Sequence, residues 1–310
     1  MNESDYNSLD GGALDIDVNK GEIDHTGAFS SLPVRALTGA LFVVAIVGCC
    51  LWHPMAFLVL FAAFTGLCTW EFTTIINAGL HLQVNRMITT VAAVYFFFAM
   101  FQFVSFMEGA GIFIPFVLTV MYLLISELYL PGFRKIENWA FAFMALLYIA
   151  LPMSMLNVLA FIGVGKDADI VYTYILTLSI FIFLWTSDTG AYLIGSKFGR
   201  HRLFPSISPK KSWEGSIGGG ALAIVASQII AIWSHDFNAE SEWRNRLLWA
   251  GLAIIVVVFG TWGDLVESRL KRKLGVKDSG HILPGHGGWL DRFDSALMAI
   301  PAAVIYIYLV

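Results

Sequence analysis

Charged residues are scarce in this 310-residue chain, and their scarcity argues against a soluble fold. Asp, Glu, Lys and Arg together make up 14% of the sequence, whereas hydrophobic residues make up 57% and the mean hydropathy is +0.71. A soluble domain has about 25% charged residues, so this many apolar side chains cannot all be buried in a soluble core. Aromatic residues contribute 15%, which excludes a disordered chain. The composition predicts a protein whose solvent is lipid.

Cysteine is nearly absent as well. The three cysteines, Cys49, Cys50 and Cys68, all lie in apolar runs and show no C-x-x-C spacing. This usage excludes a disulfide scaffold and a cysteine metal site, so we expect the three side chains to pack in the interior.

The N-terminal segment lacks long apolar runs. Residues 1–32 carry seven acidic residues against one basic residue, Lys20. The segment has neither the basic start nor the apolar core of a signal peptide. We predict a disordered acidic tail over residues 1–32, followed by a membrane domain over residues 33–310.

Long apolar runs separated by short polar breaks fill the rest of the chain. A bilayer core of about 30 Å requires roughly 20 apolar residues per helix. The run Val91–Phe106 is apolar nearly all round, unlike the one-sided stripes of a soluble bundle. We therefore predict an all-α, polytopic membrane bundle with a kink at Pro152. The nine expected spans are 34–52, 55–76, 87–107, 111–130, 138–163, 169–194, 213–234, 247–266 and 292–309.

Basic residues are distributed unequally between the two sides that nine spans would define. Sixteen of the 19 Lys and Arg residues fall on the side of the N-terminus and only three on the other. Because basic loops stay in the cytoplasm, we predict a cytoplasmic N-terminus and an external C-terminus. The loops around residues 205 and 280 are then cytoplasmic.

Polar residues gather first between residues 185 and 220. Asp188 lies inside an apolar run, where a carboxylate is costly unless it is paired, protonated or bound to a cation. It is either a hydrogen-bonded acid between helices or part of a site. Ser208, Lys210 and Lys211 precede a helix that opens with glycines, a pattern that favours a bound phosphate. A basic loop attracted to anionic lipid head groups is the alternative.

The second polar cluster covers residues 261–295. Asp264 and Glu267 are three residues apart and share a helix face, and so do Asp291 and Asp294. Two helix ends that offer carboxylates to one basic loop predict a site for a hard cation such as Mg²⁺ with substrate phosphates. Helix capping is the alternative for Asp291. His286, between glycines, is either a base or ligand or, more commonly, a hydrogen-bonded loop former.

The second cluster also carries a specific signature. It reads Ser268-x-Leu-Lys271-Arg272-x4-Lys277-Asp278-x-Gly280-x2-Leu283-Pro284-x-His286-Gly287-Gly288-x2-Asp291-Arg292-x-Asp294. This pattern resembles the integral-membrane phosphatidate cytidylyltransferases, also called CDP-diacylglycerol synthases. The resemblance spans roughly residues 180–310, the expected catalytic half. Trp289 departs from the aliphatic residue usual at its position.

The resemblance implies an enzyme that converts CTP and phosphatidate to CDP-diacylglycerol and pyrophosphate in phospholipid biosynthesis. It also implies a bacterial plasma membrane location, a homodimer, Mg²⁺ with room for a second cation such as K⁺, and no nucleic-acid partner. The expected catalytic residues are Asp264, Asp291, Asp294, Lys277 and Asp278, with Asp264, Asp291 and Asp294 as the metal ligands. The expected substrate-binding residues are Asp188, Ser208, Lys210, Lys211, Lys271, Arg272, His286 and Arg292.

Two other classes of function fit part of the sequence. A CTP-dependent lipid-alcohol kinase would use a similar nucleotide site but transfer the γ-phosphoryl group. A non-catalytic membrane scaffold or transporter would explain the spans and an isolated buried acid, but not two acid-bearing helix ends around a basic loop.

Overall fold

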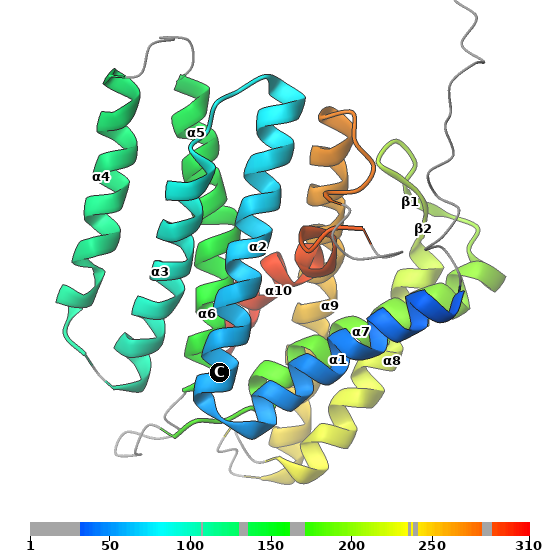
Figure 1. Ribbon diagram of the computed structural model, residues 1–310. Coiled ribbons are helices and arrows are strands. Elements are labelled where there is room, and N and C mark those ends of the chain that lie inside the picture. Colours follow the sequence, from blue (N-terminus) through cyan, green and yellow to red (C-terminus); the bar gives the residue numbers. More distant parts are fainter. Residues whose placement is uncertain are drawn as a thin grey trace, which may run out of the picture.

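The fold is that of a computed structural model (Figure 1). It describes residues 32–106, 108–129, 136–161, 171–234, 237, 241–280 and 287–310, with side chains from residue 37 onward. The expected acidic tail and His286 lie outside the described residues.

The described residues form a bundle of helices with one small hairpin, which confirms the predicted all-α membrane fold. The helices are α1 (Leu32–Trp52), α2 (Pro54–Leu80), α3 (Arg86–Ser105), η1 (Ala110–Phe113), α4 (Ile114–Tyr129), α5 (Ile136–Ala145), η2 (Leu146–Ala150), α6 (Leu151–Ala160), α7 (Ile175–Phe198), α8 (Trp213–Trp233), α9 (Glu242–Lys273) and α10 (Leu290–Leu309). The strands are β1 (Arg202–Phe204) and β2 (Ser208–Ser212).

A helix stands at each of the nine expected spans. Within the described residues, eight helices or helix runs are long and apolar enough to cross a membrane, whereas the described apolar part of α1 covers only Leu37–Trp52. The chain is thus a multi-pass membrane protein with eight candidate spans, and α1 accounts for the difference from the predicted nine.

The irregularity expected at Pro152 is a π-helical turn. The run from α5 to α6 passes through η2, which ends two residues before Pro152. Proline has no N–H to donate, and its ring displaces the carbonyl four residues earlier, here that of Tyr148. The wider turn accommodates both effects without ending the helix.

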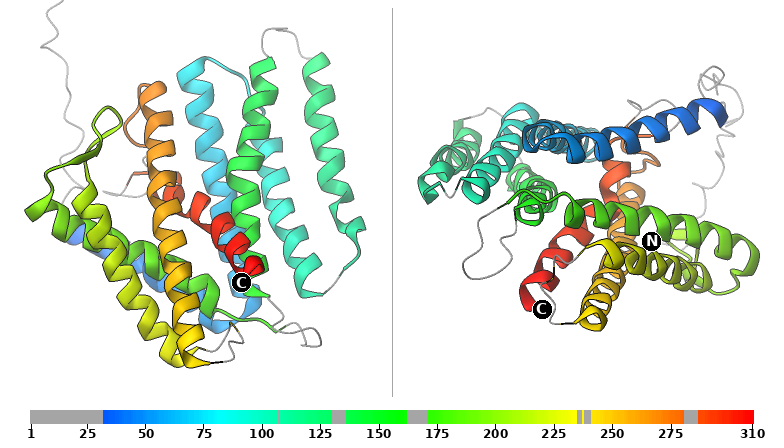
Figure 2. Two further views of the ribbon diagram at one scale, coloured as in Figure 1. Left: turned by 180° about the vertical axis from the view of Figure 1, so that it is seen from behind. Right: turned by 90° about the horizontal axis from the view of Figure 1, so that it is seen from below.

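The helices fall into two groups by direction. Helices α2 to α6 stand side by side, whereas α1, α7 and α8 run obliquely across one side of the molecule, next to the upright α9 (Figures 1 and 2). Helices α7 and α8 pack with their backbones in contact, because a Cβ atom at Gly190 would lie 2.9 Å from the Cα atom of Gly219. Such small-residue contacts replace the hydrophobic driving force that is missing in lipid.

A β-hairpin, which the sequence did not predict, carries the basic residues that follow α7. Strands β1 and β2 are antiparallel, with Arg202 opposite Ser212. Glu214, at the start of α8, closes the hairpin by contacting the His201 Nδ1 atom at 2.6 Å and accepting the backbone N–H of His201 at 3.2 Å. The Ser212 hydroxyl accepts the Gly215 N–H at 3.2 Å and caps α8. Lys210 and Lys211 are therefore held on a strand.

The connections between helices alternate between two ends of the molecule. The α2–α3 turn, the hairpin and the end of α9 lie at one end, and the α1–α2 turn, the start of α9 and the C-terminus lie at the other (Figure 1). This alternation agrees with the charge-based topology, whose cytoplasmic and external sides stay a prediction.

The predicted topology can be tested by labelling with a membrane-impermeant maleimide in intact cells. Both Ser206, in the hairpin, and Glu242, at the start of α9, are exposed. In a background without the half-buried Cys49, we expect Glu242→Cys to be labelled from outside. Ser206→Cys should react only after the cells are opened. Labelling of both positions in intact cells would contradict the topology.

Candidate active site

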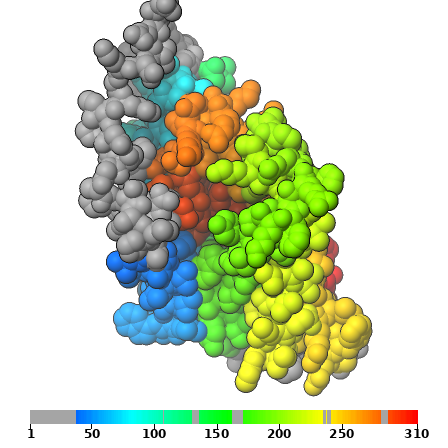
Figure 3. Space-filling model, turned by 90° about the vertical axis from the view of Figure 1, so that its right-hand side faces the viewer, coloured from blue at the N-terminus to red at the C-terminus, as the bar shows by residue number. Residues whose placement is uncertain are grey.

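Two cavities meet at Asp188 on α7. One, here called the apolar cavity, has a volume of about 590 Å³ and lies among α1, α2, α7 and α10. The other, here called the basic cavity, has a volume of about 480 Å³ and lies among α7, the hairpin and α8. Asp188 lines both. Figure 3 shows the start of α10 at the floor of a hollow bounded by α1, the end of α9 and the α7–hairpin region.

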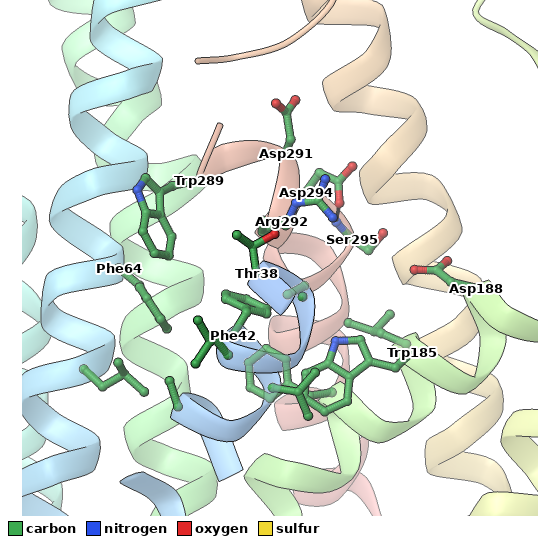
Figure 4. Close-up of a pocket in the computed structure, with 18 residues that line it drawn as sticks. Thr38, Phe42, Phe64, Trp185, Asp188, Trp289, Asp291, Arg292, Asp294 and Ser295 are labelled. Atoms are coloured by element: carbon green, nitrogen blue, oxygen red, sulfur yellow. Dashed lines mark hydrogen bonds between the residues drawn. The ribbon is translucent and has the colours of Figure 1, made fainter. Parts of the chain in front are cut away.

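The apolar cavity has an aromatic wall and a charged rim. The rings of Phe64 and Trp289 lie 5.1 Å apart, and Phe42 of α1 stands 5.8 Å from Phe64. The opposite part of the lining contains Asp188, Asp291, Arg292, Asp294 and Ser295 (Figure 4). A cavity with this division suits a ligand that has both hydrocarbon and an anionic group. Trp289, the departure from the family pattern, supplies part of the aromatic wall.

The basic cavity gathers cations and hydroxyls over a wall of glycines. Its cations are Arg202, Lys210 and Lys211, and the hydroxyls of Ser212 and Ser216 lie in the same lining. Gly195, Gly199 and Gly215 also line it, so no side chain fills that part. Clustered cations and hydroxyls of this kind suit a polyphosphate.

One acid of α9, Asp264, and one of α10, Asp294, lie close enough to interact electrostatically. Asp264 forms an ion pair with Lys211 and accepts the Ser268 hydroxyl at 3.1 Å. Asp294 is brought close to α9 by Gly263, where a Cβ atom would lie 2.5 Å from the Asp294 carbonyl oxygen. Figure 4 shows Asp188 of α7 across from Asp294. The structure thus brings together three of the predicted acids from three helices.

Asp291 is engaged differently. Its Oδ1 atom accepts Lys271 Nζ at 2.6 Å, and its Oδ2 atom accepts the backbone N–H groups of Ser279 at 3.0 Å and Gly288 at 2.8 Å. Lys271 also pairs with Glu267 at 2.5 Å. The side chains in this triad are 13%, 0% and 10% exposed for Lys271, Glu267 and Asp291. Lys271 therefore joins α9 to α10, whereas the sequence analysis expected it to bind substrate phosphate.

The other expected site residues lie around this centre. Ser208 is half-buried on β2, and Lys277 and Asp278 are exposed after α9. A Cβ atom at Gly287, whose φ is +78°, would lie 3.6 Å from the Asp278 Cβ atom and 2.7 Å from Asp291 Oδ2. Arg292 is exposed in the lining of the apolar cavity, and Arg272 is exposed on the last turn of α9.

Three contributors to the site were not predicted from the sequence. Arg202 lines the basic cavity, and Phe42 brings α1 into the apolar cavity. Glu71 of α2 contacts Ser279, in the segment before α10, and Leu290, the first residue of α10. One signal was available for Glu71, since it is the sole charged residue in the apolar run that forms α2.

The acids fit a magnesium ion that is completed by substrate. Among the described residues, no three His, Cys, Asp or Glu side chains are grouped closely enough to hold a metal ion by themselves. Mg²⁺ needs only one or two carboxylates when substrate phosphates and water supply the remaining ligands. Asp264 and Asp294 can supply these two carboxylates. Lys211, which lines the basic cavity, forms an ion pair with Asp264, so the cavity is next to this acid.

Comparisons with known proteins agree with this chemistry. Residues 33–310 match the model of a family described as the cytidylyltransferase family. A protein named phosphatidate cytidylyltransferase from Staphylococcus aureus (strain COL) is 48% identical over 124 residues, which cover 40% of this chain and 45% of the relative. One of the same name from Haemophilus influenzae is 44% identical over 126 residues, covering 41% and 43%. The chain matches less than half the length of these curated relatives.

The Lys271 triad predicts a specific effect on stability. Lys271→Met leaves Glu267 and Asp291 without their shared cation in a buried place, and removing one partner of a buried ion pair costs about 3–5 kcal/mol. The free energy of unfolding in mixed detergent micelles measures this loss. Lys273→Met, an exposed change on the same helix, is the control. Equal stability of the two variants would mean that Lys271 does not hold the helices together.

Proposed function

The chain belongs to the cytidylyltransferase family, and we propose that it transfers the cytidylyl group of CTP to phosphatidate. The products are CDP-diacylglycerol, a precursor in phospholipid biosynthesis, and pyrophosphate. The observation that carries the proposal is the meeting of an apolar cavity and a basic cavity at Asp188, beside Asp264 and Asp294. The name shared by the relatives supports the same reaction.

Phosphatidate is assigned to the apolar cavity. Its acyl chains would lie against Phe42, Phe64 and Trp289, which make the aromatic wall. Its phosphate would lie at the charged rim, where Arg292 can neutralise it. A lipid bound in this way keeps its chains in an apolar environment and presents its phosphate toward Asp188.

CTP is assigned to the basic cavity. Lys210 and Arg202 would neutralise the triphosphate, and the Ser212 and Ser216 hydroxyls lie in the same lining. Lys211 lies between this cavity and Asp264, so it links the nucleotide to the acids. Asp188, Ser208 and Arg272 complete the proposed substrate contacts, and Lys277, Asp278 and His286 stay predictions.

The proposed reaction is an in-line displacement. A phosphate oxygen of phosphatidate bonds to the α-phosphorus of CTP, and the bond from that phosphorus to the oxygen bridging to the β-phosphorus breaks. The electron pair leaves with pyrophosphate, and no covalent enzyme intermediate is needed. Positioning and neutralisation of charge can therefore supply most of the rate enhancement.

Mg²⁺ is the proposed cofactor, with Asp264 and Asp294 as the residues that would hold it. When bound, it would neutralise and orient the phosphates. Asp291, the third expected ligand, already accepts hydrogen bonds from Lys271, Ser279 and Gly288, so we assign it to positioning the start of α10. A second cation such as K⁺, a homodimer and a cytoplasmic active site in a bacterial plasma membrane stay proposals that rest on the family resemblance and on charge.

A CTP-dependent lipid-alcohol kinase is the main alternative, and doubly labelled CTP separates the two. With ³H in the cytosine and ³²P in the γ-phosphate, we expect ³H in the lipid phase and ³²P in pyrophosphate when phosphatidate and Mg²⁺ are present. Lipid that carries ³²P without ³H, formed from a lipid alcohol, would identify a kinase. Purified protein that turns over no CTP would favour a scaffold or transporter.

The three acids should respond differently to magnesium. Asp264→Asn and Asp294→Asn each remove a proposed ligand, so kcat should fall on the order of a hundredfold and part of the loss should return at high Mg²⁺. Asp291→Asn should also lower kcat, because it weakens the contact with Lys271, but high Mg²⁺ should restore a smaller part of this loss than in the two ligand variants. The measurement is cytidylyl transfer over a Mg²⁺ titration.

Each outcome of this titration separates the roles. Rescue of Asp291→Asn by Mg²⁺ to the same extent as Asp264→Asn would make Asp291 a ligand. Near-normal cytidylyl transfer by both Asp264→Asn and Asp294→Asn at low Mg²⁺ would show that these two residues of α9 and α10 are not the metal ligands. Asp188 would then be the next residue to test.

A further inference from the structure

Glu71 is the single charged residue in α2, and the proposed reaction does not use it. Its side chain is 4% exposed and lies in a helix of otherwise uncharged residues. Placing a carboxylate in the membrane-embedded part of a helix costs free energy, and such residues usually have a functional partner. The partners of Glu71 lie more than 200 positions away in the sequence.

One partner, Ser279, lies between α9 and α10, and the other, Leu290, is the first residue of α10. The Glu71 Oε2 atom accepts the Ser279 hydroxyl at 3.1 Å and the backbone N–H of Leu290 at 3.0 Å. The Oε1 atom is enclosed and has no hydrogen-bond partner within the described part of the chain. It faces Gly280, where a Cβ atom would lie 2.6 Å from it.

The bond to Leu290 places the carboxylate at the beginning of α10. The N-cap residue, Trp289, makes no side-chain cap, so the first N–H groups of α10 need an acceptor from elsewhere. Glu71 provides that acceptor from another helix, and its charge is favourable at a helix N-terminus. Helix α2 therefore fixes where α10 begins, one residue before Asp291 and four before Asp294.

The bond to Ser279 gives a second attachment to the same acids. Ser279 donates its hydroxyl to Glu71 and its backbone N–H to Asp291 Oδ2 at 3.0 Å. A Cβ atom at Gly288 would overlap Glu71 Oε2 and Ser279 Oγ. The close approach of Glu71 thus accounts for two glycines of the signature, Gly280 and Gly288.

We propose that Glu71 is a positioning residue of the active site, holding Ser279 and the N-terminus of α10 so that Asp291 and Asp294 keep their places. This proposal rests on the proposed function in one respect: the kinetic effect of changing Glu71 is measured in an assay of metal-dependent cytidylyl transfer. Glu71 belongs to the N-terminal half of the chain, whereas the other charged residues of the site lie between residues 188 and 294.

Glu71→Gln, Ser279→Ala and the double variant test this role. Glu71→Gln keeps the shape and removes the charge that suits the α10 N-terminus. We expect kcat to fall on the order of tenfold, the KM for CTP to stay within about twofold, and the Mg²⁺ midpoint to rise. Ser279→Ala should have a smaller effect, and the two changes should be non-additive because they break one contact. Thr69→Val is the control, since its buried hydroxyl donates only to Thr65 of the same helix.

A second measurement does not depend on activity. Amide hydrogen exchange of residues 287–296 should be faster in folded Glu71→Gln than in the wild-type protein, and unchanged in Thr69→Val. If Glu71→Gln does not fold, both kcat and hydrogen exchange would be measured on Ser279→Ala. Ser279 lies outside the helices, so its replacement leaves every helix sequence unchanged.

Unchanged kcat, Mg²⁺ midpoint and exchange in both Glu71→Gln and Ser279→Ala, with an active wild-type protein, would overturn the proposal. A wild-type protein without cytidylyl transfer would overturn the proposed function instead. Hydrogen exchange would then still decide whether Glu71 holds α10.

Discussion

A carboxylate inside a lipid-embedded bundle is stable only with a cation or hydrogen-bond donors close to it, and this constraint organises the C-terminal half of the protein. Lys271 lies between Glu267 and Asp291, Lys211 pairs with Asp264, and Glu71 accepts two donors. Except for the pair of Lys271 and Glu267, which lies within α9, each of these contacts joins two separate elements. The requirement to compensate charge therefore also sets the relative positions of α2, α9, α10 and the hairpin.

Two different chemical environments lie next to each other near the start of α10. On one side, aromatic rings from α1, α2, α7 and the residue before α10 keep a cavity apolar. On the other, the hairpin and α8 supply lysine, arginine and hydroxyl groups. Asp188 belongs to both, and Asp264 and Asp294 lie beside it. In the proposed reaction, a lipid phosphate and a nucleotide phosphate would thus approach each other without moving an acyl chain into a polar cavity or a triphosphate into an apolar one.

Much of the fold could be predicted because lipid leaves few options for the backbone. Hydropathy located a helix at every expected span, and Pro152 indicated the irregular turn at Leu146–Ala150. The sequence also proposed Asp264 and Asp294 as metal ligands, and that role stays a prediction. Spacing within one segment could not reveal that Lys271 binds Asp291, that Glu71 caps α10, or that Phe42 lines the cavity. Those contacts join positions far apart in the sequence, and only the packing of helices decides them.

Photocrosslinking measures most directly whether phosphatidate occupies the cavity beside Asp188. Phosphatidate with a diazirine on its acyl chain would be irradiated with the protein, Mg²⁺ and α,β-methylene CTP, which cannot transfer its cytidylyl group. We predict crosslinks to the aromatic wall at Phe42, Phe64 and Trp289, removed by excess unlabelled phosphatidate. Crosslinks confined to the apolar groove between α8 and α9, at Trp213, Ile217 and Trp262, would contradict the assignment of the lipid to this cavity.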